Sequence, residues 1–192
     1  KQRSKLRLAI FGPSGAGKTY TALRLATGIA EELGGRIAVI DTEFGTASKY
    51  ADRFKFDVLN LDGPKIKNMM DAIHAAQNYD VLIIDSLTHS WKELLQEVDK
   101  LAKAKYRGNT WSAWSEGTPL QNSMVTAIQR FSGHMIVSMR TKTEWITVED
   151  NGKSRPVRVG LAPEQGKGIE YEFDMLMEIS PEHAINVIKD RT

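Results

Sequence analysis

The feature that most constrains the fold is an eight-residue segment near the start of the chain, which reads Gly-Pro-Ser-Gly-Ala-Gly-Lys-Thr from Gly12 to Thr19. It matches the phosphate-binding P-loop pattern without a gap. An apolar run at Leu6–Phe11 precedes it, and apolar residues at helical spacing follow from Ala22 to Leu33. The segment therefore lies between a predicted strand and a predicted helix, where a glycine-rich loop can turn its N–H groups toward a phosphate.

This loop predicts a site for the phosphates of a nucleotide in which two side chains have defined roles. The ammonium group of Lys18 adds positive charge near the terminal phosphates, and the hydroxyl of Thr19 can bind Mg²⁺. A glycine-rich turn that matches by accident is the alternative, and the flanking strand and helix argue against it. The residues expected to contact the nucleotide in this part of the chain are Gly12, Pro13, Ser14, Gly15, Ala16, Gly17, Lys18, Thr19 and Tyr20.

A second apolar run, Val81–Ile84, ends in Asp85. In open α/β sheets, ligands bind at the carboxyl ends of the strands. We therefore expect Asp85 to hold Mg²⁺ through a water molecule beside Thr19. Ser86 follows Asp85 at the position where many ATPases have a glutamate, so the carboxylate that activates water must come from elsewhere in the chain.

The rest of the chain alternates apolar strand patterns with amphipathic helix patterns, which predicts a largely parallel sheet covered by helices on both faces. The last quarter departs from this scheme and predicts hairpin strands, with a turn at Asp150-Asn151-Gly152. We expect one domain over residues 1–192. The expected strands are Leu6–Phe11, Arg36–Asp41, Phe56–Leu61, Tyr79–Ile84, His134–Met139, Trp145–Glu149, Pro156–Val159, Tyr171–Ile179 and Ala184–Ile188, and the expected fourth helix is Leu120–Phe131.

Composition excludes several classes of protein. Zero cysteines exclude a disulfide scaffold and a thiolate metal site. The apolar runs are too short to span a bilayer, and no like-charge block is long enough to indicate a disordered chain. The formal net charge is +2, from 26 Lys and Arg against 24 Asp and Glu, so any contact with a polyanion must be local.

A third motif indicates which kind of P-loop protein the chain resembles. Asp41-Thr42-Glu43 stands at the end of the strand that follows the P-loop helix, and together with Gly12–Thr19 and Ile83-Ile84-Asp85-Ser86 it resembles the RecA-type recombinase core. The resemblance implies a RecA-like P-loop NTPase of the α/β class, in which Glu43 polarises the attacking water and Tyr50 stacks on adenine. The alternatives are a solvated loop carboxylate at Glu43 and a core side chain at Tyr50.

The chain is most similar to the short, single-domain RecA-like ATPases of bacteriophages, which act in single-strand annealing or recombination. The resemblance implies a Mg²⁺-dependent ATPase that binds single-stranded DNA and forms a ring or filament. It implies a cytoplasmic location in a bacterium or in a phage host, and a single-strand-binding protein is a candidate partner. The family often has a glutamine after the buried strand that leads to its second DNA loop, and this chain has none there. We expect either that Ser138 or Arg140 couples ATP to DNA or that the coupling is weaker.

The resemblance places DNA-binding loops in two segments, 103–119 and 140–168. The first mixes cations with aromatic rings, a combination that suits single strands because charges follow phosphates and rings stack on bases. Its candidate DNA contacts are Lys105, Arg107, Trp111 and Trp114. The alternative is that Trp111 and Trp114, three residues apart, form one buried helical face.

The second segment has nearly balanced charges, with its basic cluster beyond the predicted turn. We expect either a DNA loop or an arm that reaches a neighbouring subunit, against the alternative of a hairpin with a solvated charged face. A cation in this segment could also act as a finger in a neighbouring active site. The candidate DNA contacts here are Arg140, Lys153, Arg155 and Arg158.

Two other functions fit the P-loop. One is a P-loop kinase that phosphorylates a small molecule or nucleotide, with the basic last quarter as a lid. The other is a non-catalytic adaptor whose oligomeric state is gated by the nucleotide. The leading interpretation is the DNA-dependent ATPase, with Lys18, Thr19 and Asp85 holding ATP·Mg²⁺ and Glu43 orienting the water.

Overall fold

The computed structural model describes residues 4–150 and 153–192, and between 143 and 160 it describes the backbone only. The helices are α1 Lys18–Leu33, α2 Ile66–Ala75, α3 Leu87–Lys105 and α4 Thr110–Arg130, with 3-10 turns at Ala47–Tyr50 and Ile169–Glu172. The strands are β1 Arg7–Gly12, β2 Ile37–Asp41, β3 Asp57–Asn60, β4 Val81–Asp85, β5 His134–Asp150, β6 Lys153–Pro163, β7 Met175–Ile179 and β8 Ile185–Asp190.

These strands form one sheet in the order β3-β2-β4-β5-β1-β7-β8, with β6 paired to the outer part of β5. The pairs from β3 through β7 are all parallel. The two remaining pairs, β5–β6 and β7–β8, are antiparallel. The predicted fold class is therefore confirmed, a mostly parallel sheet with antiparallel hairpins in the last part of the chain.

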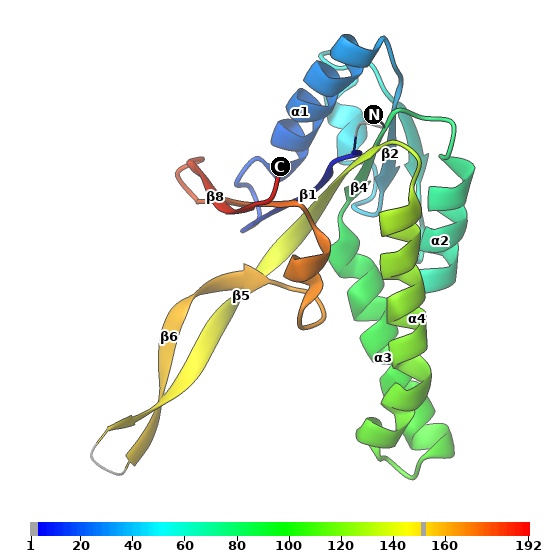
Figure 1. The fold of residues 1–192 in the computed structure, drawn as a ribbon. Coiled ribbons are helices and arrows are strands. Elements are labelled where there is room, and N and C mark those ends of the chain that lie inside the picture. The colour runs from blue at the N-terminus through cyan, green and yellow to red at the C-terminus, as the bar shows by residue number, and fades with distance from the viewer. Residues whose placement is uncertain (1–3, 151–152) are drawn as a thin grey trace.

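Alternating side chains of the central strands divide the core into two layers (Figure 1). Leu8 and Ile10 face α1, whereas Ala9 and Phe11 face the layer of α2, α3 and α4. This period of two explains why the strands read as continuous apolar runs, because a parallel sheet is covered on both faces.

The order of the strands brings distant segments to one edge of the sheet. In the register of β2 with β4, Asp41 lies opposite Asp85. In the register of β1 with β5, Gly12 lies opposite Arg140. Because parallel strands end at the same edge, the P-loop, the segment after β2, the end of β4 and Arg140 all meet there.

Two projections extend from this same edge (Figure 1). One is the pair of helices α3 and α4, joined by a short turn at residues 106–109, and the other is the hairpin of β5 and β6. The predicted hairpin is thus present, although its turn at Asp150-Asn151-Gly152 includes Asn151 and Gly152, which lie outside the described residues.

The fourth helix, α4, starts earlier than the sequence predicts. It begins at Thr110 rather than Leu120, and Pro119 lies inside it. The Oδ1 atom of Asn109 accepts a hydrogen bond from the N–H of Ser112 at 3.1 Å, which caps the helix start. A proline is most often found in the first turn of a helix. The sequence therefore indicates a helix that starts near Pro119, whereas α4 starts nine residues earlier.

Within the described residues, no helix combines the length and the apolar character needed to cross a membrane.

Candidate nucleotide site

The P-loop connects β1 to α1 as the motif predicted. Gly17 precedes the first residue of α1 with a φ of 96°, a left-handed conformation that favours glycine. Gly12 passes so close to β7 that a Cβ atom would lie 2.5 Å from the carbonyl oxygen of Ile179. Both glycines are therefore required by the backbone path, at the loop entrance and at the helix start.

Lys18 is buried at the centre of the loop. Its Nζ donates hydrogen bonds to the carbonyl oxygens of Gly12 at 3.0 Å and Pro13 at 2.8 Å. Burial lowers the pKa of Lys18, and the nearby carboxylates of Glu43 and Asp85 oppose this shift. An ammonium group held only by neutral carbonyls is available to a phosphate, which offers it a full negative charge.

Asp85 is buried at the end of β4 and receives two hydroxyl donors. Thr19 Oγ1 donates to its Oδ2 at 2.6 Å, and Ser138 Oγ donates to its Oδ1. Burial raises the pKa of this carboxyl, while the two hydrogen bonds lower it. The sequence prediction placed Thr19 and Asp85 side by side, and the structure does bring them together.

The site fits Mg²⁺ by the chemistry of its donors. Thr19 supplies a hydroxyl and Asp85 a carboxylate, and Mg²⁺ prefers oxygen ligands and usually combines one or two carboxylates with substrate phosphates and water. Thr19 and Asp85 would therefore hold the ion, and the bound ion would neutralise charge on the phosphates.

Glu43 lies in a tight loop after β2 that Asp41 shapes. Asp41 Oδ1 accepts a hydrogen bond from the N–H of Glu43 at 2.6 Å, and Oδ2 accepts one from the N–H of Ala47 at 2.7 Å. Thr46 Oγ1 also donates to the carbonyl of Glu43 at 2.7 Å. The loop thus holds the Glu43 backbone at the nucleotide edge of the sheet. The role of Asp41 was not predicted, although an aspartate beside a short polar loop is a common sign of such a turn.

A cavity of about 290 Å³ joins these groups, and Arg140 forms part of its wall. Arg140 donates from Nε and Nη2 to Oε1 of Glu43, at 3.1 and 3.0 Å. The sequence assigned Arg140 to DNA and did not predict this ion pair. The residues that line the cavity are Ser14, Gly15, Gly17, Lys18, Thr19, Glu43, Thr46, Tyr50, Asp85 and Arg140.

Tyr50, which is expected to stack on adenine, lies near Tyr20, which is also expected to contact the nucleotide. Tyr50 lines the cavity, and its ring lies 6.1 Å from that of Tyr20, centroid to centroid. Tyr50 also packs against the core layer under α1. It therefore has both the position expected for an adenine contact and the packing of a core side chain.

One residue near the loop was not predicted. Nδ1 of His183, in the turn between β7 and β8, lies 3.0 Å from the carbonyl oxygen of Ala16. No sequence pattern links these residues, since the contact depends on β7 lying beside β1.

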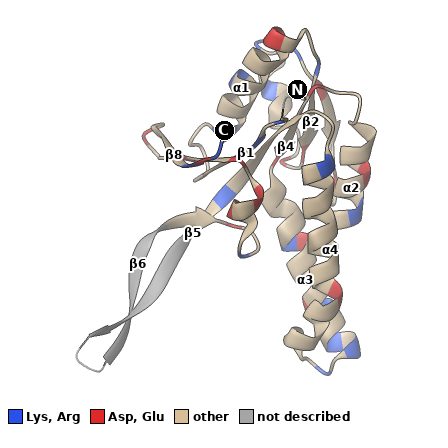
Figure 2. Cartoon of the chain, in the orientation of Figure 1, with Lys and Arg blue, Asp and Glu red and all other residues tan. Residues whose placement is uncertain are grey.

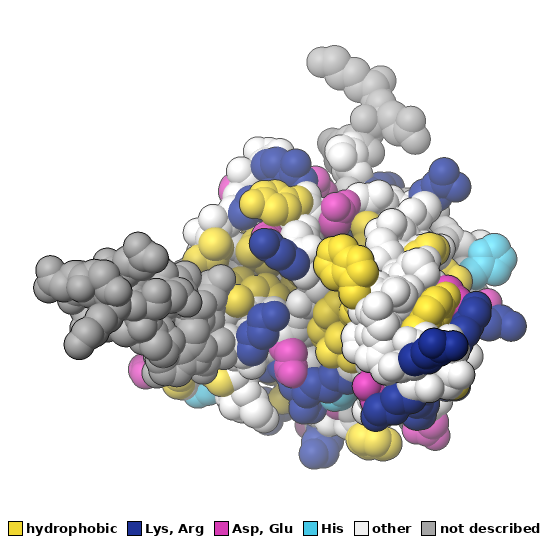
Figure 3. Space-filling model, turned by 90° about the horizontal axis from the view of Figure 1, so that it is seen from below, with side chains coloured by type: hydrophobic (Ala, Val, Ile, Leu, Met, Phe, Trp, Pro, Cys, Tyr) yellow, Lys and Arg dark blue, Asp and Glu magenta, His cyan; other side chains and the backbone are white. Residues whose placement is uncertain are grey.

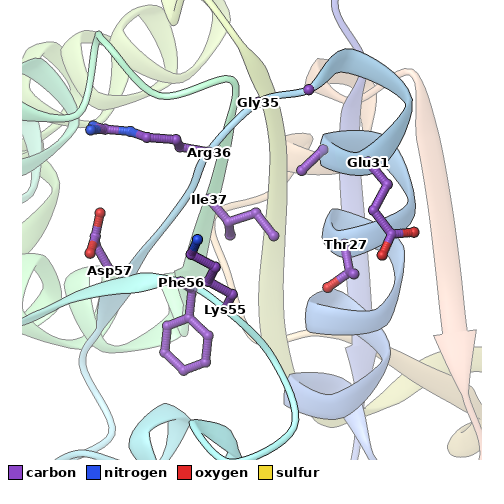
Figure 4. A pocket seen from close by; sticks show the side chains of 10 residues that line it. Thr27, Glu31, Gly35, Arg36, Ile37, Lys55, Phe56 and Asp57 are labelled. Carbon is purple, nitrogen blue, oxygen red and sulfur yellow. The ribbon is translucent and has the colours of Figure 1, made fainter.

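A larger cavity, about 400 Å³, lies at the opposite edge of the sheet (Figure 4). Thr27 and Glu31 of α1 flank it on one side, and Ile37, Phe56 and Asp57 lie on the other. It is formed at the amino ends of β2 and β3, away from the P-loop. Ligands of open α/β sheets bind at the carboxyl ends, so the smaller cavity is the candidate nucleotide site.

The structure corrects the first expected DNA loop. Residues 103–119 are the end of α3, a short turn and the start of α4, rather than a long loop. Lys105 donates to Glu116 Oε1 at 2.5 Å, so its charge is balanced. Trp114 stacks on Trp91 with ring centroids 5.7 Å apart and packs against the core.

The tip of this helix pair still presents two candidate DNA contacts. The side chain of Trp111 is 88% exposed, so the two tryptophans do not form one buried face. Arg107 is also exposed, in the turn between the helices, with a φ of 52°. Basic residues gather at this tip (Figure 2), and Lys and Arg side chains are seen over the same end of the molecule in Figure 3.

In the second segment, Arg140 belongs to the nucleotide cavity. Lys153, Arg155 and Arg158 lie on β6, and their side chains are outside the described part of the structure. Their role therefore stays a prediction.

Comparisons with known proteins show the family and the fold of the chain. A family model described as an AAA domain matches residues 4–191. No curated protein matches the chain. Among solved structures, the chain is similar to a KaiC-like protein from the hyperthermophilic archaeon Pyrococcus horikoshii OT3, with a TM-score of 0.52 and 16% identity over 97% of this chain and 79% of that one.

At this identity the solved structure supports the fold alone, and the fold agrees with the RecA-like P-loop ATPase core predicted from the sequence. The family match spans almost the whole chain. The chain therefore belongs to the AAA domain family.

Proposed function

We propose that this chain is a Mg²⁺-dependent ATPase that binds single-stranded DNA and promotes annealing or recombination as a RecA-like oligomer. The observation that carries the ATPase proposal is the single cavity that joins Lys18, Thr19, Asp85 and Glu43. A P-loop cation, a hydroxyl–carboxylate pair and a second carboxylate are the groups that phosphoryl transfer to water requires.

In this mechanism Lys18 binds the terminal phosphates and stabilises the charge that develops on them. Glu43 accepts a hydrogen bond from the attacking water and orients it. The water oxygen bonds to the γ-phosphorus, the bond from that phosphorus to the bridging oxygen breaks, and ADP leaves. The water proton moves toward the carboxylate of Glu43.

DNA binding is proposed from the surface of the α3–α4 tip. Trp111 is exposed in the first turn of α4, and Arg107 is exposed in the turn that precedes this helix. An aromatic platform with a neighbouring cation suits single-stranded DNA, because every base has a face that can stack. The basic residues of β6, Lys153, Arg155 and Arg158, are proposed as further contacts with the backbone of the strand.

Self-association is proposed from the residue next to Glu43. Phe44 is 91% exposed at the nucleotide edge and has a φ of 56°. Aromatic side chains contribute strongly to binding when a partner buries them. We propose that a neighbouring subunit covers it, so that the nucleotide lies between subunits. A single-strand-binding protein, which coats single-stranded DNA, is proposed as a partner.

The test is ATP turnover with and without single-stranded DNA, at low and high salt. The proposal predicts that DNA stimulates turnover and that DNA affinity falls steeply as salt rises, because phosphate contacts release counterions. Turnover that ignores DNA and responds to a nucleoside or metabolite would instead support a P-loop kinase. Nucleotide binding that changes the oligomeric state without turnover would support an adaptor.

A further inference from the structure

The ion pair between Arg140 and Glu43 engages one oxygen of the carboxylate that is proposed to orient the attacking water. Both guanidinium donors converge on Oε1 of Glu43, at 3.1 and 3.0 Å. A water molecule would have to compete with two guanidinium donors at Oε1, and the other oxygen, Oε2, points where the ion pair directs it. A charge-assisted contact with two donors also holds the carboxylate in one orientation.

The backbone of Arg140 is held from three sides. It lies opposite Gly12 in the β1–β5 register. Its N–H donates to Thr88 Oγ1 at 2.9 Å, and its carbonyl oxygen accepts a hydrogen bond from the N–H of Glu164 at 2.7 Å. Its side chain can therefore change partners while the strand stays in place.

Arg140 is also the residue where the hairpin leaves the sheet. Beyond it, β5 continues from Thr141 into the pairing with β6. Its side chain is 41% exposed, against 22% for Glu43, so an outside anion can reach the guanidinium more easily than it can reach the carboxylate. A phosphate diester is such an anion, because its two oxygens match the arginine fork.

We propose that Arg140 is a positioning residue that restrains Glu43 in the DNA-free protein, and that a phosphate of single-stranded DNA bound at the base of the β5–β6 hairpin takes over the guanidinium and releases Glu43. This inference rests on the proposed DNA-dependent ATPase. In this scheme hydrolysis is slow until DNA arrives, and the P-loop does not need to move.

The test compares Arg140→Gln with the unchanged protein. Loss of the restraint is expected to raise DNA-free turnover about fivefold, the change that corresponds to a partly exposed ion pair. The rise is expected in kcat, since the freedom of Glu43 affects the hydrolytic step. Turnover of the variant should be nearly the same with and without DNA, because no restraint remains to be released.

Two further variants connect the effect to Glu43. Arg140→Lys keeps the charge but loses the fork, so its DNA-free turnover should lie between those of the unchanged protein and Arg140→Gln. This variant also provides the test if Arg140→Gln does not fold. In the double variant Arg140→Gln with Glu43→Gln, turnover should be as low as with Glu43→Gln alone.

The matched control is Lys92→Gln. Lys92 pairs with Glu164 at 3.1 Å near the same hairpin base, and the two side chains are 42% and 30% exposed. Removal of this pair should leave both DNA-free turnover and DNA stimulation unchanged. An equal rise in turnover with Lys92→Gln would mean that loosening of the hairpin base, rather than the Glu43 contact, sets the rate, and would overturn the proposal.

The outcomes separate this inference from the proposed function. Unchanged or reduced DNA-free turnover in folded Arg140→Gln overturns the restraint, and full retention of DNA stimulation overturns the release step, even if DNA stimulates the unchanged protein. If DNA does not stimulate the unchanged protein, the proposed function fails. A fivefold rise with Arg140→Gln would then still support the restraint on Glu43.

Discussion

Thr19 and Asp85 are joined by a hydrogen bond of 2.6 Å, although they are 66 residues apart in the chain. The bond connects the first turn of α1 to the end of β4. It orients the buried carboxylate of Asp85 toward the hydroxyl that the P-loop supplies. Burial makes the charged form of this carboxylate costly, so the group that suits Mg²⁺ lowers the stability of the nucleotide-free protein.

Asp85→Asn is therefore expected to stabilise the nucleotide-free protein and to abolish Mg²⁺-dependent hydrolysis. Asparagine removes the buried charge, and the hydroxyls of Thr19 and Ser138 can reorient to bond its amide. The expected gain at neutral pH is about 0.5–2 kcal/mol in the free energy of unfolding. Chemical denaturation measures the gain, and equal or lower stability of the variant at neutral pH would contradict it.

The gain should also depend on pH, because burial raises the pKa of Asp85 in the folded protein above its ordinary value of 3.8. Below pH 3.8 the carboxyl is protonated in both states, so the stability it contributes is fully present. As pH rises through the raised pKa, the folded protein loses that stability. The advantage of Asp85→Asn should thus be smallest in acid and grow as pH rises.

Glu43→Gln is expected to retain ATP binding and to lower turnover by about 10²–10⁴-fold, the range for loss of a general base. Glutamine keeps the shape of the side chain but cannot accept the proton. Binding of a fluorescent ATP analogue and steady-state phosphate release measure the two effects. Glu32→Gln, on the exposed surface of α1, is the control and should change neither. Unaltered turnover in Glu43→Gln would remove Glu43 from the mechanism.

Trp111→Ala is expected to weaken binding of single-stranded DNA by about 5–150-fold, the equivalent of one lost stacked base at about 1–3 kcal/mol. Its side chain is 88% exposed, so the free energy of unfolding should change by no more than about 0.5 kcal/mol. Fluorescence anisotropy with an oligonucleotide measures the affinity.

Trp114→Ala provides the contrast for this prediction. Because Trp114 stacks on Trp91, its loss should destabilise the fold by about 1–3 kcal/mol. If Trp111→Ala binds DNA as tightly as the unchanged protein does, the tip of α3 and α4 is not a DNA contact.

Arg7→Met is expected to lower the free energy of unfolding by at least about 2 kcal/mol, since each buried carbonyl left without a partner costs about 1–3 kcal/mol. The guanidinium of Arg7 donates to the carbonyl oxygens of Gly133 at 2.8 Å and Gln129 at 3.0 Å, and to that of Phe131. These bonds tie β1 to the end of α4. The Tm should fall by about 4–8 °C.

Arg24→Met, an exposed position on α1, is the control for Arg7→Met and should leave the Tm almost unchanged. A Tm unaffected by Arg7→Met would show that the end of α4 does not depend on this contact.

The sequence by itself determined the P-loop, the strand that ends in Asp85, and the parallel sheet covered on both faces. These depend on spacing within single segments: glycines at a loop, four apolar residues before a carboxylate, and stripes at helical or strand period. The start of α4 was not predictable from the same information, because Pro119 is tolerated inside a helix that is held by its packing against α3.

Only the tertiary structure decided that Arg140 meets Glu43, that Trp111 is exposed while Trp114 is packed, and that His183 reaches the P-loop. Arg140 and Glu43 are 97 residues apart. They meet because a single strand, β4, separates β2 from β5 in the sheet. Strand order of this kind depends on how all the elements pack together, and no local pattern in the chain records it.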